Sequence, residues 1–229
     1  MDGRAIIEVL TVLVVAFIAF VVVPLFLLFL YIKYRGGNAE MHQTIAAVKS
    51  GTITDLLPWD STSLGELTRE WVGHSTYTTS MFGRSDQAAG HVPSSRAPSG
   101  WLLVFSVETK NDGADGRVLA MTSAHRLELV LAGGAWRATL NGTVLGTFKK
   151  GEAPITAPDG AQLGTFLPGA PLVVRGREVA TLNTPRAAAS ARTPSPSQLV
   201  THLLTERTPE DEAWTLVIAV FQLAQASAE

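Results

Sequence analysis

The feature that most constrains this chain is an uninterrupted apolar run from Val12 to Ile32, twenty-one residues without a charge. At about 1.5 Å rise per residue, a helix of this length spans roughly 30 Å, the thickness of a bilayer's hydrocarbon core. Backbone amides in lipid must be paired within the segment, so the run is expected to be helical. We therefore predict a membrane-spanning helix that includes Val12, Phe17, Pro24, Phe29 and Ile32, with a kink at Pro24.

A cleaved secretory signal peptide is the alternative interpretation of this run. Its apolar part would have about 7–15 residues and would end in small side chains before a cleavage site. The run in this chain is longer and ends in the bulky residues 29–32, so it favours an uncleaved anchor.

Charged residues beside the run predict its orientation, because the cytoplasmic flanks of membrane helices are enriched in lysine and arginine. Arg4 stands alone before the run, whereas Lys33 and Arg35 follow it directly. We therefore expect a single-pass protein of the cell inner membrane, with a periplasmic N-terminus and a cytoplasmic C-terminal domain. Tyr31 and Tyr34 lie where an interfacial aromatic belt contacts headgroups or a partner, which makes them interface candidates.

The sequence divides after this anchor, residues 1–35, into a juxtamembrane segment, residues 36–100, with mixed signals. The glycine pair at 36–37 is expected to end the membrane helix, and helical spacing of apolar residues between 64 and 71 predicts a short helix. Residues 83–100 are rich in glycine, serine and proline, which is typical of a linker or long surface loop.

Residues 101–184 are predicted to form an antiparallel β domain, because eight to ten short apolar runs alternate with turn signals. A motif in which a polar residue and glycine precede a strand begins at residues 141, 159 and 175, with a looser copy at 115. Alternation along the strands predicts one shared face for the small residues Gly146, Gly164 and Ala180 and the larger Phe148, Phe166 and Leu182. Small side chains repeated on one face predict that another element packs closely against it.

The remaining residues are read as a flexible linker, 185–198, and a C-terminal helical segment, 199–229. Thr208 and Pro209 are typical of a helix start, and the run 213–224 that follows is apolar on every side. Such a helix is too short to span a bilayer and too apolar to face water. We predict that it is buried, in its own domain or against a partner, through Trp214, Ile218 and Phe221.

The fold class expected from these patterns is a single N-terminal transmembrane helix followed by a mainly β, barrel-like domain of antiparallel hairpins with a buried apolar C-terminal helix. The glycine-containing hairpins and the run 213–224 make residues 101–225 resemble the tubby C-terminal-like barrel of the phospholipid scramblase and LURP-one-related families. In these families a β-barrel wraps around a hydrophobic C-terminal helix, so the resemblance implies that architecture and a lipid-related function. The chain departs from them in its N-terminal membrane helix, in having no cysteine-rich segment and in its smaller predicted strand count.

The overall plan is also similar to that of the H subunit of purple-type photosynthetic reaction centres. In that subunit, one N-terminal helix that starts outside the membrane precedes a cytoplasmic β-rich domain. The similarity implies a subunit that caps the cytoplasmic face of a larger membrane complex.

Composition and motifs exclude several kinds of chemistry. Cysteine is absent, so the chain has no disulfides, thiolate zinc sites, iron–sulfur clusters or cysteine nucleophile. A net charge of −2 does not supply the broad positive field that nucleic-acid binding needs. The five histidines are scattered without metal-ligand spacing, and no nucleophile elbow or phosphate-binding loop is present. We predict no enzymatic activity, no catalytic, metal or cofactor site, and no nucleic-acid partner.

Trp59 is the third interface candidate, since it follows a proline in a predicted loop just beyond the membrane. The sequence is equally compatible with a tryptophan that contacts a partner or the bilayer interface and with one that belongs to the core.

These observations predict a non-enzymatic accessory subunit that stabilises a larger membrane complex from its cytoplasmic face, with other integral membrane subunits as partners. An energy-converting assembly, such as a photosynthetic reaction centre with its antenna, is one host of this kind. The alternative is a scramblase-like lipid-binding or lipid-sensing module at the membrane surface. Two interpretations are open for Lys149, Lys150, Arg175 and Arg177: contacts with anionic headgroups, or solvated hairpin ends, which are the commoner role of such residues.

Overall fold

The computed structural model describes residues 17–80, 83–95, 97, 100–110, 114–152, 154–187 and 197–228. Contacts divide the chain into two units, Met1–Glu40 and Met41–Glu229. In the first unit, a π-helical turn, η1 (Ile18–Val22), leads directly into the helix α2 (Val23–Ser50). The regular α-helical pattern is lost in the turn before Pro24, whose ring removes a backbone hydrogen-bond donor.

Within the residues that the structure describes, no helix combines the length and the apolar character of a membrane span. Val12 lies outside the described residues, so the predicted span stays a prediction.

The prediction that the glycine pair at 36–37 ends this helix is wrong, because α2 continues through both glycines to Ser50. Each glycine costs a helix only about 1 kcal/mol relative to alanine. Packing of the last turns of α2 offsets that cost: Met41 and Ile45 form a buried cluster with Ala89 of the sheet. Packing on a neighbouring element therefore determines where α2 ends, and the local glycine signal does not.

The second unit is built on one sheet, in which the structure describes thirteen strands in the order β12-β1-β2-β3-β4-β5-β6-β7-β8-β9-β10-β11-β13. All neighbours are antiparallel except β1 and β12, which are parallel. The strands are β1 (Glu70–Ser80), β2 (Gly83–Pro93), β3 (Trp101–Lys110), β4 (Asp115–Met121), β5 (Arg126–Ala132), β6 (Ala135–Leu140) and β7 (Thr143–Phe148). They continue with β8 (Pro154–Thr156), β9 (Gln162–Thr165), β10 (Leu172–Val174), β11 (Arg177–Leu182), β12 (Arg186–Ala187) and β13 (Val200–Leu203).

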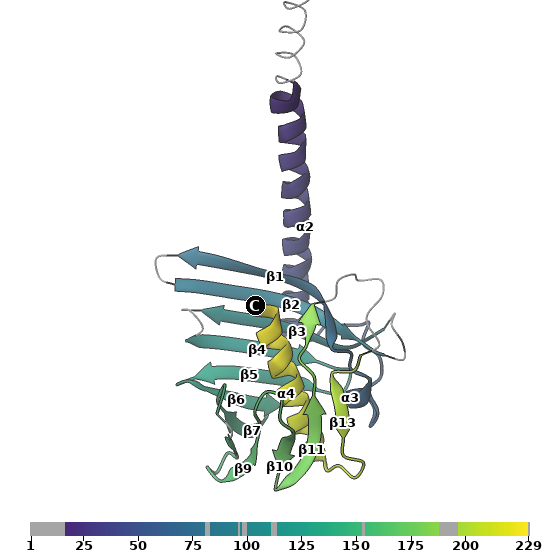
Figure 1. Cartoon of the computed structure of the whole chain (residues 1–229), viewed down its shortest axis with the longest axis vertical. Helices are drawn as coiled ribbons and strands as arrows, with labels where there is room; N and C mark the ends of the chain where they lie inside the picture. Colours follow the sequence, from purple (N-terminus) through teal and green to yellow (C-terminus); the bar gives the residue numbers. More distant parts are fainter. Residues whose placement is uncertain are drawn as a thin grey trace, which may run out of the picture. The chain divides into compact units, whose positions relative to one another are not determined.

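The sheet curls around the C-terminal helix α4 (Pro209–Ala228), as Figure 1 shows. The helix contacts strands from both ends of the strand order, β12 and β1 to β5 on one side and β10 and β11 on the other. Backbone hydrogen bonds also link the segments that precede β1 and β13: the Leu199 amide donates to the Leu67 carbonyl at 2.7 Å, and the Arg69 amide donates to the Ser197 carbonyl at 3.0 Å. The predictions of a mainly antiparallel β domain and of a C-terminal helix packed in it are therefore confirmed.

Alternation along β2, β3 and β4 gives the sheet two buried faces in this region. Val118 and Ala120 of β4 join the core around α4, whereas Leu119 between them packs with Val48 of α2. A strand covered on both sides carries a nearly continuous apolar run, which is the pattern in the first seven residues of β3.

Three predictions about the flanking segments are wrong. The expected loop at 83–100 contains β2, and the expected helical start of the segment 199–229 contains β13. The predicted helix around residues 64–71 is reduced to α3 (Ser63–Glu66), and β1 begins at Glu70. Residues 64, 67 and 71 are nevertheless all buried, so the apolar spacing identified the core face but not the backbone conformation.

Part of β1 was expected, because residues 75–82 have the pattern of a strand, and glycine explains why β2 was taken for a loop. Gly73 and Gly90 are paired across these two strands. A Cβ atom on Gly73 would lie 2.2 Å from the Ala89 carbonyl oxygen, and one on Gly90 would lie 3.0 Å from the ring of Trp71. The same glycines that allow this close approach are typical of loops in a sequence.

The start of α4 and the repeated small residues match their predictions. The Thr208 hydroxyl accepts a hydrogen bond from the Asp211 amide at 3.2 Å, and the Asp211 carboxylate accepts one from the Thr208 amide at 2.8 Å. The residues predicted to share one strand face are all buried: Gly146, Phe148, Gly164, Phe166, Ala180 and Leu182. A Cβ atom on Gly146 would lie 2.2 Å from the Thr156 carbonyl oxygen of β8 and 3.2 Å from the indole of Trp214, so both the neighbouring strand and α4 approach closely there.

Candidate functional site

Aromatic side chains of the sheet pack edge-to-face on α4. The ring of Phe148 lies 4.9 Å from that of Phe221 and 6.3 Å from that of Trp214, and Trp136 lies 5.7 Å from Phe221. Trp214, Ile218 and Phe221 are buried, as the apolar run in the sequence predicts. This cluster fills the middle of the domain and determines where space remains beside the helix.

The space that remains is a cavity of about 400 Å³ beside the last turns of α4. Its apolar walls come from β3, β4, β5, β6 and α4: Val107, Val118, Leu131, Trp136, Phe221 and Ala224. Apolar side chains around a hollow of this size are typical of sites that hold small apolar molecules. We refer to this hollow as the apolar cavity.

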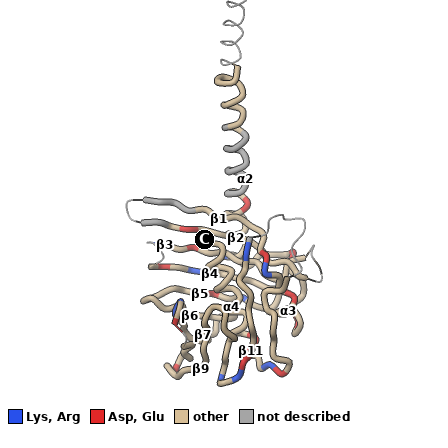
Figure 2. Tube along the Cα trace, viewed as in Figure 1, with Lys and Arg blue, Asp and Glu red and all other residues tan. Residues whose placement is uncertain are grey.

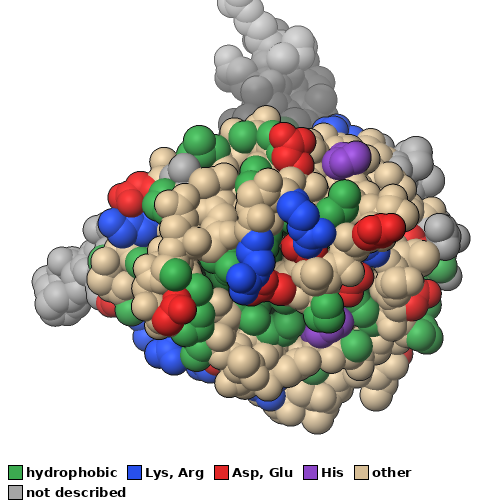
Figure 3. Space-filling view, turned by 90° about the horizontal axis from the view of Figure 1, so that it is seen from below, with side chains coloured by type: hydrophobic (Ala, Val, Ile, Leu, Met, Phe, Trp, Pro, Cys, Tyr) green, Lys and Arg blue, Asp and Glu red, His purple; other side chains and the backbone are tan. Residues whose placement is uncertain are grey.

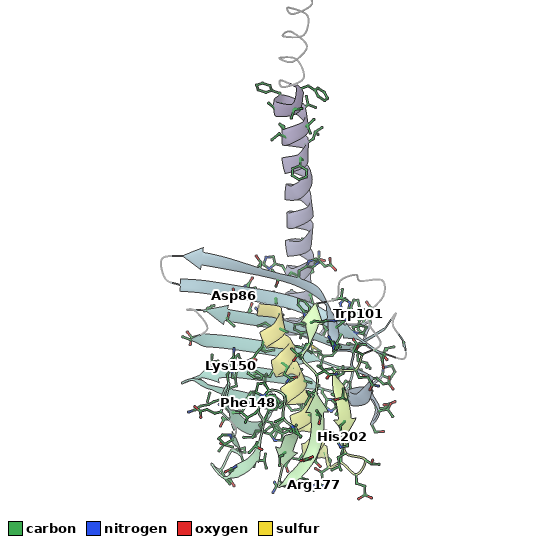
Figure 4. The ribbon with its side chains drawn as sticks, viewed as in Figure 1. Asp86, Trp101, Phe148, Lys150, Arg177 and His202 are labelled. Atoms are coloured by element: carbon green, nitrogen blue, oxygen red, sulfur yellow. The ribbon has the colours of Figure 1, made fainter. Side chains whose placement is uncertain are left out.

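Three polar residues complete the lining of the apolar cavity: Thr109, Gln225 and Lys150. Lys150 is exposed, so it lies at the rim, and no acidic residue is among the lining residues that the structure describes. Its neighbour Lys149 instead pairs with Glu152 at 3.3 Å. Figure 4 shows Lys150 and Phe148 on the same side of the domain, with Trp101 on the opposite side.

The other cations considered as headgroup contacts are engaged at the start of α4. Arg175 pairs with Glu210 at 2.5 Å, and Arg177 pairs with the buried Asp211 at 2.5 Å. Figure 2 shows charged residues at strand ends and loops around α4, and Figure 3 shows basic and acidic side chains side by side on the face seen from below. Of the four cations, Lys150 alone has no ion pair within the described part of the chain.

A second, smaller hollow of about 160 Å³ lies beside the first turns of α4. Trp59, His125 and Glu212 line it, and the Trp59 ring packs edge-on against the His125 ring at 5.6 Å. The Trp59 amide donates to the Ser123 hydroxyl at 2.8 Å, and the indole packs on the core around α4. The structure thus places Trp59 in a wall of its own domain.

The pKa of His125 is lowered from 6.5, because burial disfavours the charged imidazole more than the carboxylate of Glu212 favours it. Neutral histidine is a possible metal ligand, but the described residues contain no group of three or more histidine and acidic side chains that could hold a metal ion. The lining of the hollow combines apolar side chains with one imidazole, one amide and one carboxylate.

The lowered pKa of His125 predicts a pH dependence of stability. The unfolded chain binds a proton at His125 near pH 6.5 and the folded chain only at lower pH, so the unfolded state binds more protons in between. The free energy of unfolding is therefore expected to fall as the pH drops below 6.5, and His125→Gln should remove this part of the fall. Urea unfolding at several pH values measures it, with His202→Gln as a control for the loss of an exposed histidine. An equal pH dependence in wild type and His125→Gln would contradict the prediction.

The other candidate residues of the sequence analysis lie on the N-terminal helix. Phe17 and Pro24 are exposed on it. The side chains of Phe29, Tyr31, Ile32 and Tyr34 lie outside the part that the structure describes. Sequence reasoning did not find the apolar cavity, because its lining residues are dispersed over four strands, their turns and one helix and look like ordinary core positions. The apolar run at residues 213–224 was the only feature of the sequence that drew attention to this part of the domain.

Comparison with known proteins identifies no relative of this chain: no family model, curated protein or solved structure matches it.

Proposed function

We propose that this chain is a membrane-tethered, non-enzymatic binding module whose β domain holds an apolar or amphiphilic molecule in the apolar cavity. The observation that carries the proposal is the cavity itself, about 400 Å³ and walled mainly by buried apolar side chains. The cavity opens to solvent at the rim where Lys150 lies, and a concave, mostly apolar hollow of this size is typical of ligand-binding sites. The sheet curled around an apolar C-terminal helix also agrees with the proposed likeness to scramblase-like barrels.

The tether is supported by the N-terminal helix. Its large apolar side chains are exposed from Phe17 to Leu28, with Phe20 at 81% and Leu25 at 60%. Exposed apolar surface of this kind is stabilised when lipid or another protein covers it. We propose that lipid covers it, in the inner membrane, with the β domain on the cytoplasmic side as the flanking cations favour.

The second candidate function is the accessory subunit. The same exposed apolar row favours it, because a helix of a larger membrane complex would cover that surface as well as lipid does. The two candidates differ in the role of the apolar cavity. The binding module requires a ligand in it, whereas the accessory subunit gives it no role.

Photolabelling of the full chain in phosphatidylcholine vesicles with a neutral, apolar diazirine tests the proposal. Peptides from β4, β5 and the end of α4 are expected to be labelled, together with residues 17–28. Ala224→Trp, which fills the apolar cavity, should lose the cavity labels and keep those on the helix; Leu131→Trp is a second filling variant if the first unfolds. Cavity peptides without label in the wild-type chain would overturn the binding module, and an unlabelled 17–28 segment would overturn the tether.

A further inference from the structure

We infer that the ligand of the apolar cavity is a single-chain amphiphile with an anionic headgroup, and that Lys150 selects the headgroup. This inference rests on the proposed function and names the ligand class of the same site. It follows from the volume of the cavity, from the position of the one cation among its described lining residues and from the pairing of the neighbouring charges.

Volume limits the ligand to one chain. An apolar protein cavity of about 150 Å³ holds benzene, which has six carbon atoms. In proportion, a cavity of about 400 Å³ has room for roughly sixteen carbon atoms, which is one alkyl chain of ordinary length. The two chains of a diacyl lipid need about twice that space.

The alkyl chain of the ligand and its headgroup are expected to contact different parts of the cavity lining. The walls that reach the core contain Val118, Phe221 and Ala224, all nearly inaccessible to solvent. The rim is the part of the lining where a charged group is exposed to solvent, because Lys150 lies there. An alkyl chain against the buried walls therefore leaves its headgroup near the Lys150 ammonium group.

Charge at the rim favours an anion. Lys150 has no ion pair or side-chain hydrogen bond among the described residues, whereas Lys149 is paired with Glu152 at 3.3 Å. The C-terminal end of α4 opposes an anion, because Gln225 of the cavity lies in its last turn and α4 ends at Ala228. A helix end carries a partial charge of only about half an elementary charge. The full charge of Lys150 thus outweighs the helix end at the headgroup position.

A pair of chain-matched probes separates this inference from the proposed function. The full chain in phosphatidylcholine vesicles is labelled with a diazirine fatty acid or with the fatty alcohol of the same length, and yields are normalised to the probe content of the vesicles. Alkaline pH keeps the carboxyl group ionised, because a lipid surface raises its pKa. The acid is expected to label the cavity peptides about fivefold more than the alcohol, which corresponds to about 1 kcal/mol for one cation near a lipid surface.

Variants of the two neighbouring lysines provide the matched control. Lys150→Gln should abolish the preference for the acid and Lys150→Arg should keep it, whereas Lys149→Gln should leave it unchanged. Equal labelling by acid and alcohol in the wild-type chain, or equal competition by a diacyl phosphatidate, overturns the inference and leaves the binding module standing. Labelling of the cavity by neither probe overturns both.

Discussion

Gly146→Ala is expected to lower the free energy of unfolding by about 3–5 kcal/mol, through combined overpacking and backbone strain. Gly146 has a φ angle of +149°, and a Cβ atom there would lie 2.2 Å from the Thr156 carbonyl oxygen. Backbone of the neighbouring strand cannot move away as a flexible side chain can. The added methyl group therefore forces β7 and β8 apart where β7 also packs on Trp214 of α4. Urea unfolding of the full chain, followed by the fluorescence of its tryptophans, measures the loss.

Gly65→Ala is the matched control for this substitution. A Cβ atom on Gly65 would have no neighbour within 4 Å, and the residue lies in the short helix α3. Alanine is the better helix former by about 1 kcal/mol, so this variant should be as stable as wild type or slightly more stable. If the two alanine variants unfolded at the same urea concentration, the close approach at Gly146 would have no energetic weight.

Gly146 illustrates what could be predicted from the sequence. The motif that contains Gly146 recurs along the chain and predicted a close approach, because it combines a local turn signal with strand alternation. One partner in that approach, β8, is the next strand along the chain, but the other, α4, lies more than sixty residues further on, and no local pattern specifies it. In the same way, the start of α4 was predictable from Thr208 and Pro209, since a helix cap is formed by neighbours in sequence.

Long-range packing accounts for the errors. The end of α2 depends on contacts of Met41 and Ile45 with the sheet, and β2 depends on the pairing of Gly90 with Gly73. The apolar cavity depends on side chains from four strands and α4 that meet only in the folded chain. The sequence does not distinguish Lys150 from Lys149, because the difference between them is the ion pair that Lys149 forms with Glu152 in the folded chain.

Trp214→Ala is expected to cost about 3–5 kcal/mol, the usual range for truncating a buried tryptophan. Trp214 has no exposed surface, and its ring packs against Phe148 and close to Gly146. The strand β7, which carries Gly146 and Phe148, is paired with β6 on one side and β8 on the other, and these pairings hold it away from the space that the ring leaves. Chemical unfolding of the full-length variant measures the loss, with far-ultraviolet circular dichroism to verify that α4 still forms.

Trp214→Phe distinguishes a loss of packing from a loss of hydrogen bonding. The indole Nε1 of Trp214 is buried without a hydrogen-bond partner in the described part of the chain. An unpaired buried donor costs about 1–3 kcal/mol, so phenylalanine removes a penalty while it removes ring volume. The two effects nearly offset each other, and Trp214→Phe should lie within about 1 kcal/mol of wild type on this account. A phenylalanine variant as unstable as the alanine variant would mean that the indole nitrogen finds a partner, such as bound water, and that α4 is held by polar contacts in addition to the aromatic ones.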